Sequence, residues 1–204
     1  MLKKLLFLLL VFIPNIVKAD DCLAYKLTPK ITITIPYWQK DVIQPLQSMD
    51  TTHGNVIATF VDNYEITTDI TSIEDGFCVS LKSIDATMGY TDFIVRIDKS
   101  YKPNTCSYNT ILSHEDMHIN AYLSIIEDNK NLFNESLQYA ANSITPIFIK
   151  TIEEAESATD KLNEQLQKHP EIVLLKQNIK AQEEIRNKYV DEKYNGELLK
   201  KCSD

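Results

Sequence analysis

The chain has 204 residues, a formal net charge of −8 and 44% hydrophobic residues, with four glycines and seven prolines. This composition excludes a largely disordered chain and provides enough apolar residues for one compact core. The acidic balance argues against nucleic acid and against an anionic membrane surface as partners.

The first residues have the three-part layout of a secretory signal peptide. Two lysines give a basic start, an apolar run extends from Leu5 to Ile13, and Ala19 precedes a cleavage point. The apolar run is too short to span a bilayer. We therefore predict a signal peptide over residues 1–19 and a secreted or periplasmic protein with no integral membrane span after cleavage. The alternatives are an uncleaved anchor or a buried amphipathic start.

The cysteine content fits an exported chain. An even number of cysteines in such a chain predicts disulfide bonds rather than free thiols. Several connectivities are open, and we expect Cys78 to pair with Cys106 and Cys22 to pair with Cys202. A zinc site made of thiolates is disfavoured, because the chain has no Cys-x-x-Cys spacing.

The first half of the mature chain is rich in β-branched residues. Residues 30–38 alternate apolar and Thr positions as far as Pro36, which predicts a strand. Weaker or shorter strand patterns follow at 56–61, 64–70, 77–81 and 92–97. Together they predict a small N-terminal antiparallel sheet of about five short strands.

The second half has helical periodicity. We expect a helix over 107–127, a polar turn at 128–131, a second helix over 132–144, and two C-terminal helices at 151–168 and 171–193 with a stop at Gly196. Strands followed by helices predict an α+β fold, with a helix pair after the sheet. We assign residues 20–150 to one α+β domain and residues 151–204 to a helical C-terminal extension that packs on the same domain.

The chemistry is concentrated in residues 113–118, Ser-His-Glu-Asp-Met-His. His114 and His118 are four residues apart, so on a helix both imidazoles lie on one face and can converge on one metal ion. In zinc peptidases with this spacing, the carboxylate after the first histidine takes a proton from a water that the metal activates. The pattern predicts a Zn²⁺ site with His114 and His118 as ligands and Glu115 as the catalytic base. The predicted helix pair is then of zincin type, and the domain over residues 20–150 is metallopeptidase-like. The alternative is an exposed helix that carries two histidines by chance.

A catalytic zinc usually takes three protein ligands and one water. The metzincin spacing is excluded, because Ser124 stands where that subclass requires its third histidine. We expect Glu135 as the third ligand, since a helix that folds back after the predicted turn would present it to the histidines. The alternative is a surface Glu near a helix start. Other residues of a suitable type are His53, Glu153, Glu154 and His169.

Three residues close to the motif have two interpretations each. Asp116 and Asn120 could orient a ligating imidazole or could be solvated positions. Tyr122, one turn after His118, could donate a hydrogen bond to a developing oxyanion. A helical aromatic residue at this spacing is more often part of the core.

The chain resembles a bacterial family of predicted secreted zinc-dependent proteases of gluzincin-like type. The resemblance rests on the His-Glu-x-x-His motif, on Pro36-Tyr37-Trp38, on Cys106-x-Tyr108 and on the segment from Tyr189 to Gly196. The family pattern has Gly where Met117 stands and His where Asn195 stands. The resemblance covers about residues 25–200 and implies peptide hydrolysis outside the cytoplasm.

Two classes of function follow from these observations. The first is an exported zinc metallopeptidase that acts on a peptide or protein substrate. The second is a non-catalytic exported protein-binding or assembly module, with a degenerate or structural metal site and a partner bound by the C-terminal helices. Metal sequestration is a weaker third option, because it usually requires more than four histidines.

Overall fold

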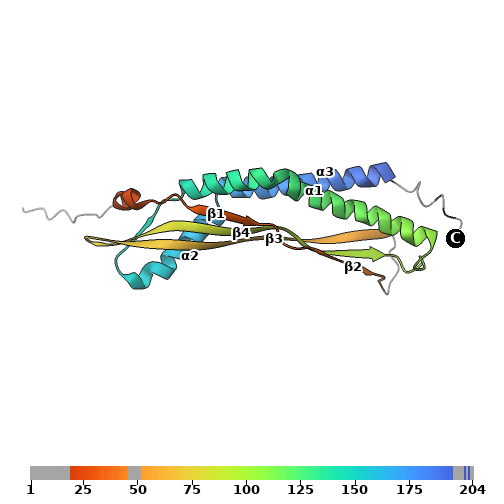
Figure 1. Cartoon of the computed structure of the whole chain (residues 1–204), viewed down its shortest axis with the longest axis horizontal. Coiled ribbons are helices and arrows are strands. Elements are labelled where there is room, and N and C mark those ends of the chain that lie inside the picture. The colour runs from red at the N-terminus through yellow and green to blue at the C-terminus, as the bar shows by residue number, and fades with distance from the viewer. Residues whose placement is uncertain (1–18, 46–51, 195–199, 201, 203–204) are drawn as a thin grey trace, which may run out of the picture.

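The computed structural model describes residues 19–45, 52–194, 200 and 202. The predicted signal peptide, apart from Ala19, and the predicted helix stop at Gly196 lie outside these residues. The molecule is long and narrow, with two long helices laid along a long sheet (Figure 1). The secondary structure elements are η1 (Ala19–Tyr25), β1 (Lys30–Thr34), β2 (Gln39–Ile43), β3 (Gly54–Ile73), β4 (Gly76–Ile97), α1 (Cys106–Ser143), β5 (Ile147–Ile149), η2 (Ile152–Glu154), α2 (Ala155–Gln167) and α3 (Pro170–Tyr194).

A long antiparallel hairpin forms the centre of the sheet. β3 has 20 residues and β4 has 22, and they pair along their whole length. The segment 82–91, which lay between two predicted strands, belongs to β4 because its alternate residues are buried: Ile84, Ala86, Met88 and Tyr90. Two register shifts in the hairpin, at Thr59/Phe60 and Thr67/Thr68, are sites where the strand can re-aim its side chains.

Three short strands occupy the other edge of β4. β5 pairs with it antiparallel at 77–79, and β1 and β2 pair with it parallel at 83–87 and 92–96. The fold is α+β, but the predicted small antiparallel sheet is wrong: the sheet is mixed and five-stranded. The sequence pattern gives burial period but not strand direction, and β2 and β5 were too short or too polar to be recognised.

A close backbone approach joins β1 to β2. Gly89 of β4 has φ of +151°, and a Cβ there would lie 2.8 Å from Pro36 Cδ. Only glycine adopts this conformation easily and leaves room for the proline ring. The chain can therefore pass Pro36 over β4 and continue along the same edge as β2.

α1 is one continuous helix of 38 residues, so the turn predicted at 128–131 is wrong. Its polar stretch stays helical because two of its residues, Asp128 and Asn129, bind side chains of another helix. Asn129 is buried and exchanges amide hydrogen bonds with Gln182 of α3, at 3.1 and 3.2 Å. Asp128 pairs with Arg186 of α3 at 2.8 Å. Tertiary contacts thus satisfy the groups that would otherwise favour a turn.

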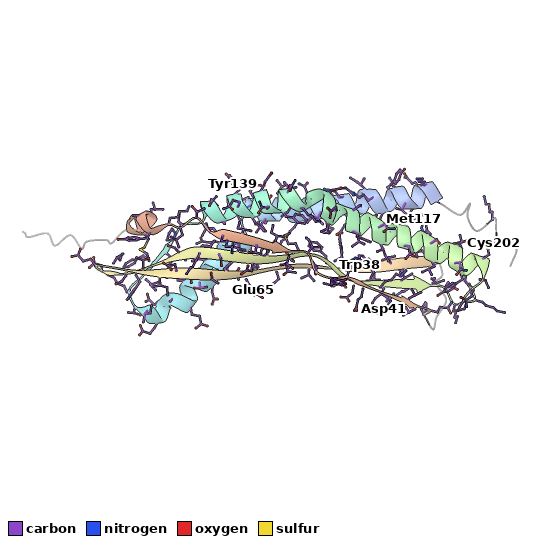
Figure 2. The ribbon with its side chains drawn as sticks, in the orientation of Figure 1. Trp38, Asp41, Glu65, Met117, Tyr139 and Cys202 are labelled. Atoms are coloured by element: carbon purple, nitrogen blue, oxygen red, sulfur yellow. A yellow bond between two sulfur atoms is a disulfide. The ribbon has the colours of Figure 1, made fainter. Side chains whose placement is uncertain are left out.

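α3 packs antiparallel on α1, and both lie along one face of the sheet, while α2 lies toward the other face at one end (Figure 1). In Figure 2, Trp38 lies between the strands and α1, whereas Tyr139 projects from α1 away from the sheet. The core between α1 and the sheet includes Phe93, Ile97, Ile125 and Phe133. None of the described helices combines the length and apolar composition that a bilayer crossing requires.

The two disulfides lie at opposite ends of the molecule. Cys22 pairs with Cys78 and Cys106 pairs with Cys202, which contradicts the expected pairing. Cys78 is near the start of β4 and Cys106 follows its end, and an extended strand of this length separates them by roughly 60 Å. A disulfide requires Cα atoms within about 7 Å, so the expected Cys78–Cys106 bond is impossible here.

Candidate metal centre

The motif histidines lie in the third and fourth turns of α1, near Met117 in Figure 2. Thr105 caps the helix by accepting a hydrogen bond from Tyr108 N. Ile111 and Ile119 are buried and fix which face of α1 meets the sheet. The histidines therefore face sideways, toward α3. Their Nε2 atoms are 3.2 Å apart, as the four-residue spacing predicted.

Asp191 of α3 completes a cluster with the two histidines. Its Oδ1 is 3.4 Å from His114 Nε2 and 3.1 Å from His118 Nε2. Zn–N and Zn–O bonds of about 2.0 Å in a tetrahedral site place neighbouring donor atoms about 3.3 Å apart. The three donor atoms therefore have the spacing of one face of a zinc tetrahedron, which leaves the fourth vertex for water or substrate. No other cluster of three metal-binding side chains occurs among the described residues.

The chemistry of these donors also suits zinc. Two imidazoles and a carboxylate are common zinc ligands in catalytic sites. Burial and the neighbouring His118 lower the pKa of His114. The neutral, metal-binding form of His114 is therefore favoured at neutral pH. Asp191 is the exposed member, with 64% of its side chain accessible, so the cluster opens to solvent on its side.

Asn187 of α3 holds His118 from behind. His118 Nδ1 lies 2.7 Å from Asn187 Oδ1. The Asn187 amide also donates from Nδ2 to the backbone oxygen of Glu183 at 2.8 Å. A ligating imidazole usually has such a partner on its second nitrogen, which orients the ring.

Glu115 points from α1 toward the sheet and is only 2% exposed. A Cβ at Gly54, the first residue of β3, would lie 2.6 Å from Glu115 Oε1 and 2.8 Å from Ile111 Cγ2. Gly54 therefore provides the space for this carboxylate. Burial, then the negative charges of Asp191 and Asp116, raise the pKa of Glu115 to about 7. A carboxyl with this pKa can exchange a proton near neutral pH.

Glu135 is not near the histidines. It is exposed on the same continuous helix, and its Cα lies about 25 Å along the axis from His118. The expectation that Glu135 is the third ligand fails geometrically, because it required the helix to fold back at 128–131. Asp191 occupies the place expected for it.

The other candidate ligands also lie elsewhere. His53 Nδ1 is 2.6 Å from the Tyr101 hydroxyl, and His169 Nε2 is 2.7 Å from Ser143 Oγ. Glu153 and Glu154 belong to η2, beside α2. None of these residues belongs to the cluster of His114, His118 and Asp191.

The residues beside the motif in sequence have separate environments. Asp116 pairs with Lys40 of β2 at 2.8 Å, and Asn120 is exposed. The Tyr122 ring packs on Tyr90, with ring centroids 5.1 Å apart, as the core interpretation predicts. Tyr122 also hydrogen-bonds Asn187, so it contributes to the support of His118 rather than only to the core.

Sequence reasoning missed Asp191 and Asn187. One signal was available: Glu183, Asn187 and Asp191 are four residues apart and form a polar stripe on α3, opposite His114, His118 and Tyr122 on α1. Asp191 also lies within the segment 189–196 that contributed to the family resemblance. Neither pattern says which helix the stripe would face.

The comparisons with known proteins add no relative to this description. Searches against protein-family models, curated proteins and solved structures found no match to the chain.

Proposed function

We propose that this chain is an exported, zinc-dependent metallopeptidase in which His114, His118 and Asp191 bind the metal. The proposal depends on one observation: three donor atoms from two helices lie 3.1 to 3.4 Å apart, as on the face of a zinc tetrahedron. Asp191 replaces Glu135 as the third ligand. The two disulfides agree with an oxidising compartment, where such bonds persist.

Glu115 is the catalytic residue in this proposal. When bound, Zn²⁺ would lower the pKa of a water molecule and polarise the scissile carbonyl. Glu115 would accept a proton from that water and donate it to the leaving amine. Its pKa of about 7 suits both transfers, because the carboxylate and the carboxylic acid are then both accessible near neutral pH.

The test combines metal analysis with cleavage of an unstructured peptide library. The wild-type protein should bind one zinc per chain and cleave the library. Asp191→Asn should weaken zinc binding strongly, whereas Glu192→Gln, the neighbouring residue on α3, and Glu135→Gln should not. Glu115→Gln should keep the zinc and reduce cleavage by about 10²–10⁴-fold. Wild-type protein that binds no zinc, or a Glu115→Gln variant with full activity, would overturn the proposal.

A structural metal site is the second candidate, and the low exposure of Glu115 favours it. A metal held by Asp191 and the two histidines would cross-link α3 to α1 whether or not a substrate reaches Glu115. The protein would then be a non-catalytic exported binding module. Zinc would raise its stability, but neither the wild type nor Glu115→Gln would cleave peptides.

A further inference from the structure

His118 has two ring nitrogens, and its position between two acceptors poses a choice. A neutral imidazole carries one proton, on Nδ1 or on Nε2. Nδ1 faces Asn187 Oδ1 at 2.7 Å, whereas Nε2 faces Asp191 Oδ1 at 3.1 Å and His114 Nε2 at 3.2 Å. Either oxygen could accept the proton's hydrogen bond. Only the form with the proton on Nδ1 leaves a lone pair on Nε2 for a metal.

The orientation of the Asn187 amide decides in favour of this form. Its Nδ2 donates to the Glu183 backbone oxygen at 2.8 Å, which turns Oδ1 toward His118. An amide oxygen can only accept a hydrogen bond, so Nδ1 of His118 must carry the proton. Without Asn187, the Asp191 carboxylate would be the stronger acceptor and would draw the proton to Nε2.

Asn187 is itself held by its surroundings. Tyr122 of α1 hydrogen-bonds its side chain. One turn earlier on α3, the Glu183 carboxylate accepts a hydrogen bond from the Tyr90 hydroxyl of β4. Tyr90 is 3% exposed, and its ring packs against Phe60 and Tyr122. The sheet thus anchors the turn of α3 that carries Asn187.

We propose that Asn187 is the positioning residue of the metal centre, because it holds His118 in the Nδ1-protonated tautomer with the Nε2 lone pair directed at His114 and Asp191. Asn187 does not touch the metal or the substrate. The value of this tautomer rests on the proposed function, but the tautomer itself exists in the metal-free protein and can be measured there.

The primary test is the tautomer of His118 in metal-free, ¹⁵N-labelled protein above pH 7, from long-range ¹H–¹⁵N NMR correlations. Wild-type His118 should be protonated on Nδ1. Asn187→Leu, which removes the acceptor at similar volume, should shift the proton to Nε2. Asn187→Asp restores an acceptor and should restore the wild-type tautomer. A wild-type His118 protonated on Nε2, or an Asn187→Leu variant with an unchanged tautomer, would overturn the proposal.

The second readout is zinc affinity, measured by competition with a chromophoric chelator. Asn187→Leu should bind zinc about 10–100-fold more weakly, and Asn187→Asp should recover most of this loss. Gln182→Leu is the matched control, since it breaks an amide pair between the same two helices but leaves His118 alone. Gln182→Leu should change neither the His118 tautomer nor the zinc affinity. If Gln182→Leu lost as much zinc affinity as Asn187→Leu, the loss would be due to helix packing, and the positioning role of Asn187 would be refuted.

The two readouts separate this inference from the proposed function. An Nδ1-protonated His118 that depends on Asn187, in a protein that binds no zinc, would support the tautomer assignment and reject the metallopeptidase. Stoichiometric zinc in a protein whose His118 tautomer does not depend on Asn187 would reject the tautomer assignment and leave the proposed metal site intact.

Discussion

The two halves of the α1–α3 interface differ in how their polar side chains are paired. In the half around Asn129, each donor meets an acceptor: the Asn129 and Gln182 amides exchange hydrogen bonds, and Arg186 binds both Ser124 and Asp128. In the half around His118, two imidazole nitrogens meet a carboxylate: the Nε2 atoms of His114 and His118 lie beside Asp191 Oδ1. His118 Nε2 lies 3.1 Å from Asp191 Oδ1.

This difference fits a packing role for the first half and the proposed metal site in the second half. Where donors are paired with acceptors, the interface needs no ligand, and the hydrogen bonds fix the register of the two helices. Two imidazole nitrogens and a carboxylate oxygen this close together can be joined by a hydrogen-bonded proton or by a bound cation. The same pair of helices therefore combines a packing interface with, next to it, the proposed metal site.

The largest expected effect comes from removing a ligand of the proposed metal site. Zinc at about 1,000 times its Kd should stabilise the wild-type protein by about 4 kcal/mol, because it binds only the folded chain. His118→Ala should abolish this stabilisation, and Asn129→Leu should keep it. Thermal or urea unfolding with and without zinc measures the difference. An equal zinc response in His118→Ala would place the metal elsewhere.

The next effect concerns Glu115 and pH in the metal-free protein. Because its pKa is raised to about 7, the folded protein binds this proton more tightly than the unfolded chain does. The free energy of unfolding should therefore fall as pH rises from about 4.5 to about 7, by roughly 2–3 kcal/mol, and then level off. Glu115→Gln should lack this component in urea unfolding with a chelator present. Identical pH dependence in both proteins would contradict the buried position of Glu115.

A smaller effect is expected from breaking the packing half of the interface, at Asn129 and Gln182. Asn129→Leu removes both hydrogen bonds between the buried Asn129 amide and the half-buried Gln182 amide, so the free energy of unfolding should fall by about 1–3 kcal/mol. Zinc affinity should stay within about twofold, since no ligand is touched. A large loss of zinc affinity in this variant would mean that the two halves of the interface are coupled and do not have separate roles.

The smallest effect lies on the outer side of the motif. Lys40 and Asp116 form an ion pair 2.8 Å apart, with side chains 32% and 41% exposed. Exposed ion pairs of this kind contribute about 0–1 kcal/mol. Lys40→Gln should therefore change the free energy of unfolding by less than about 1 kcal/mol and leave zinc affinity unchanged. A loss of zinc on this substitution would give β2 a role in the site.

The sequence predicted features that depend on near neighbours along the chain. The four-residue spacing of His114 and His118 fixes a shared helix face, and the structure brings their Nε2 atoms to 3.2 Å. The C-terminal helices were predicted within a few residues, because their apolar period and Pro170 are local signals. The β-rich first half was also recognised, although its strands were predicted too short.

Only the tertiary structure decided which distant segments meet. Whether the polar stretch 128–131 turns or stays helical depends on Gln182 and Arg186 of α3, and this in turn decides whether Glu135 or Asp191 can reach the histidines. The disulfide pairing depends likewise on the length of β4, which separates Cys78 from Cys106. The physical reason is common to these cases: local periodicity selects the face of an element, while its partner is selected by burial and hydrogen bonding over the whole fold.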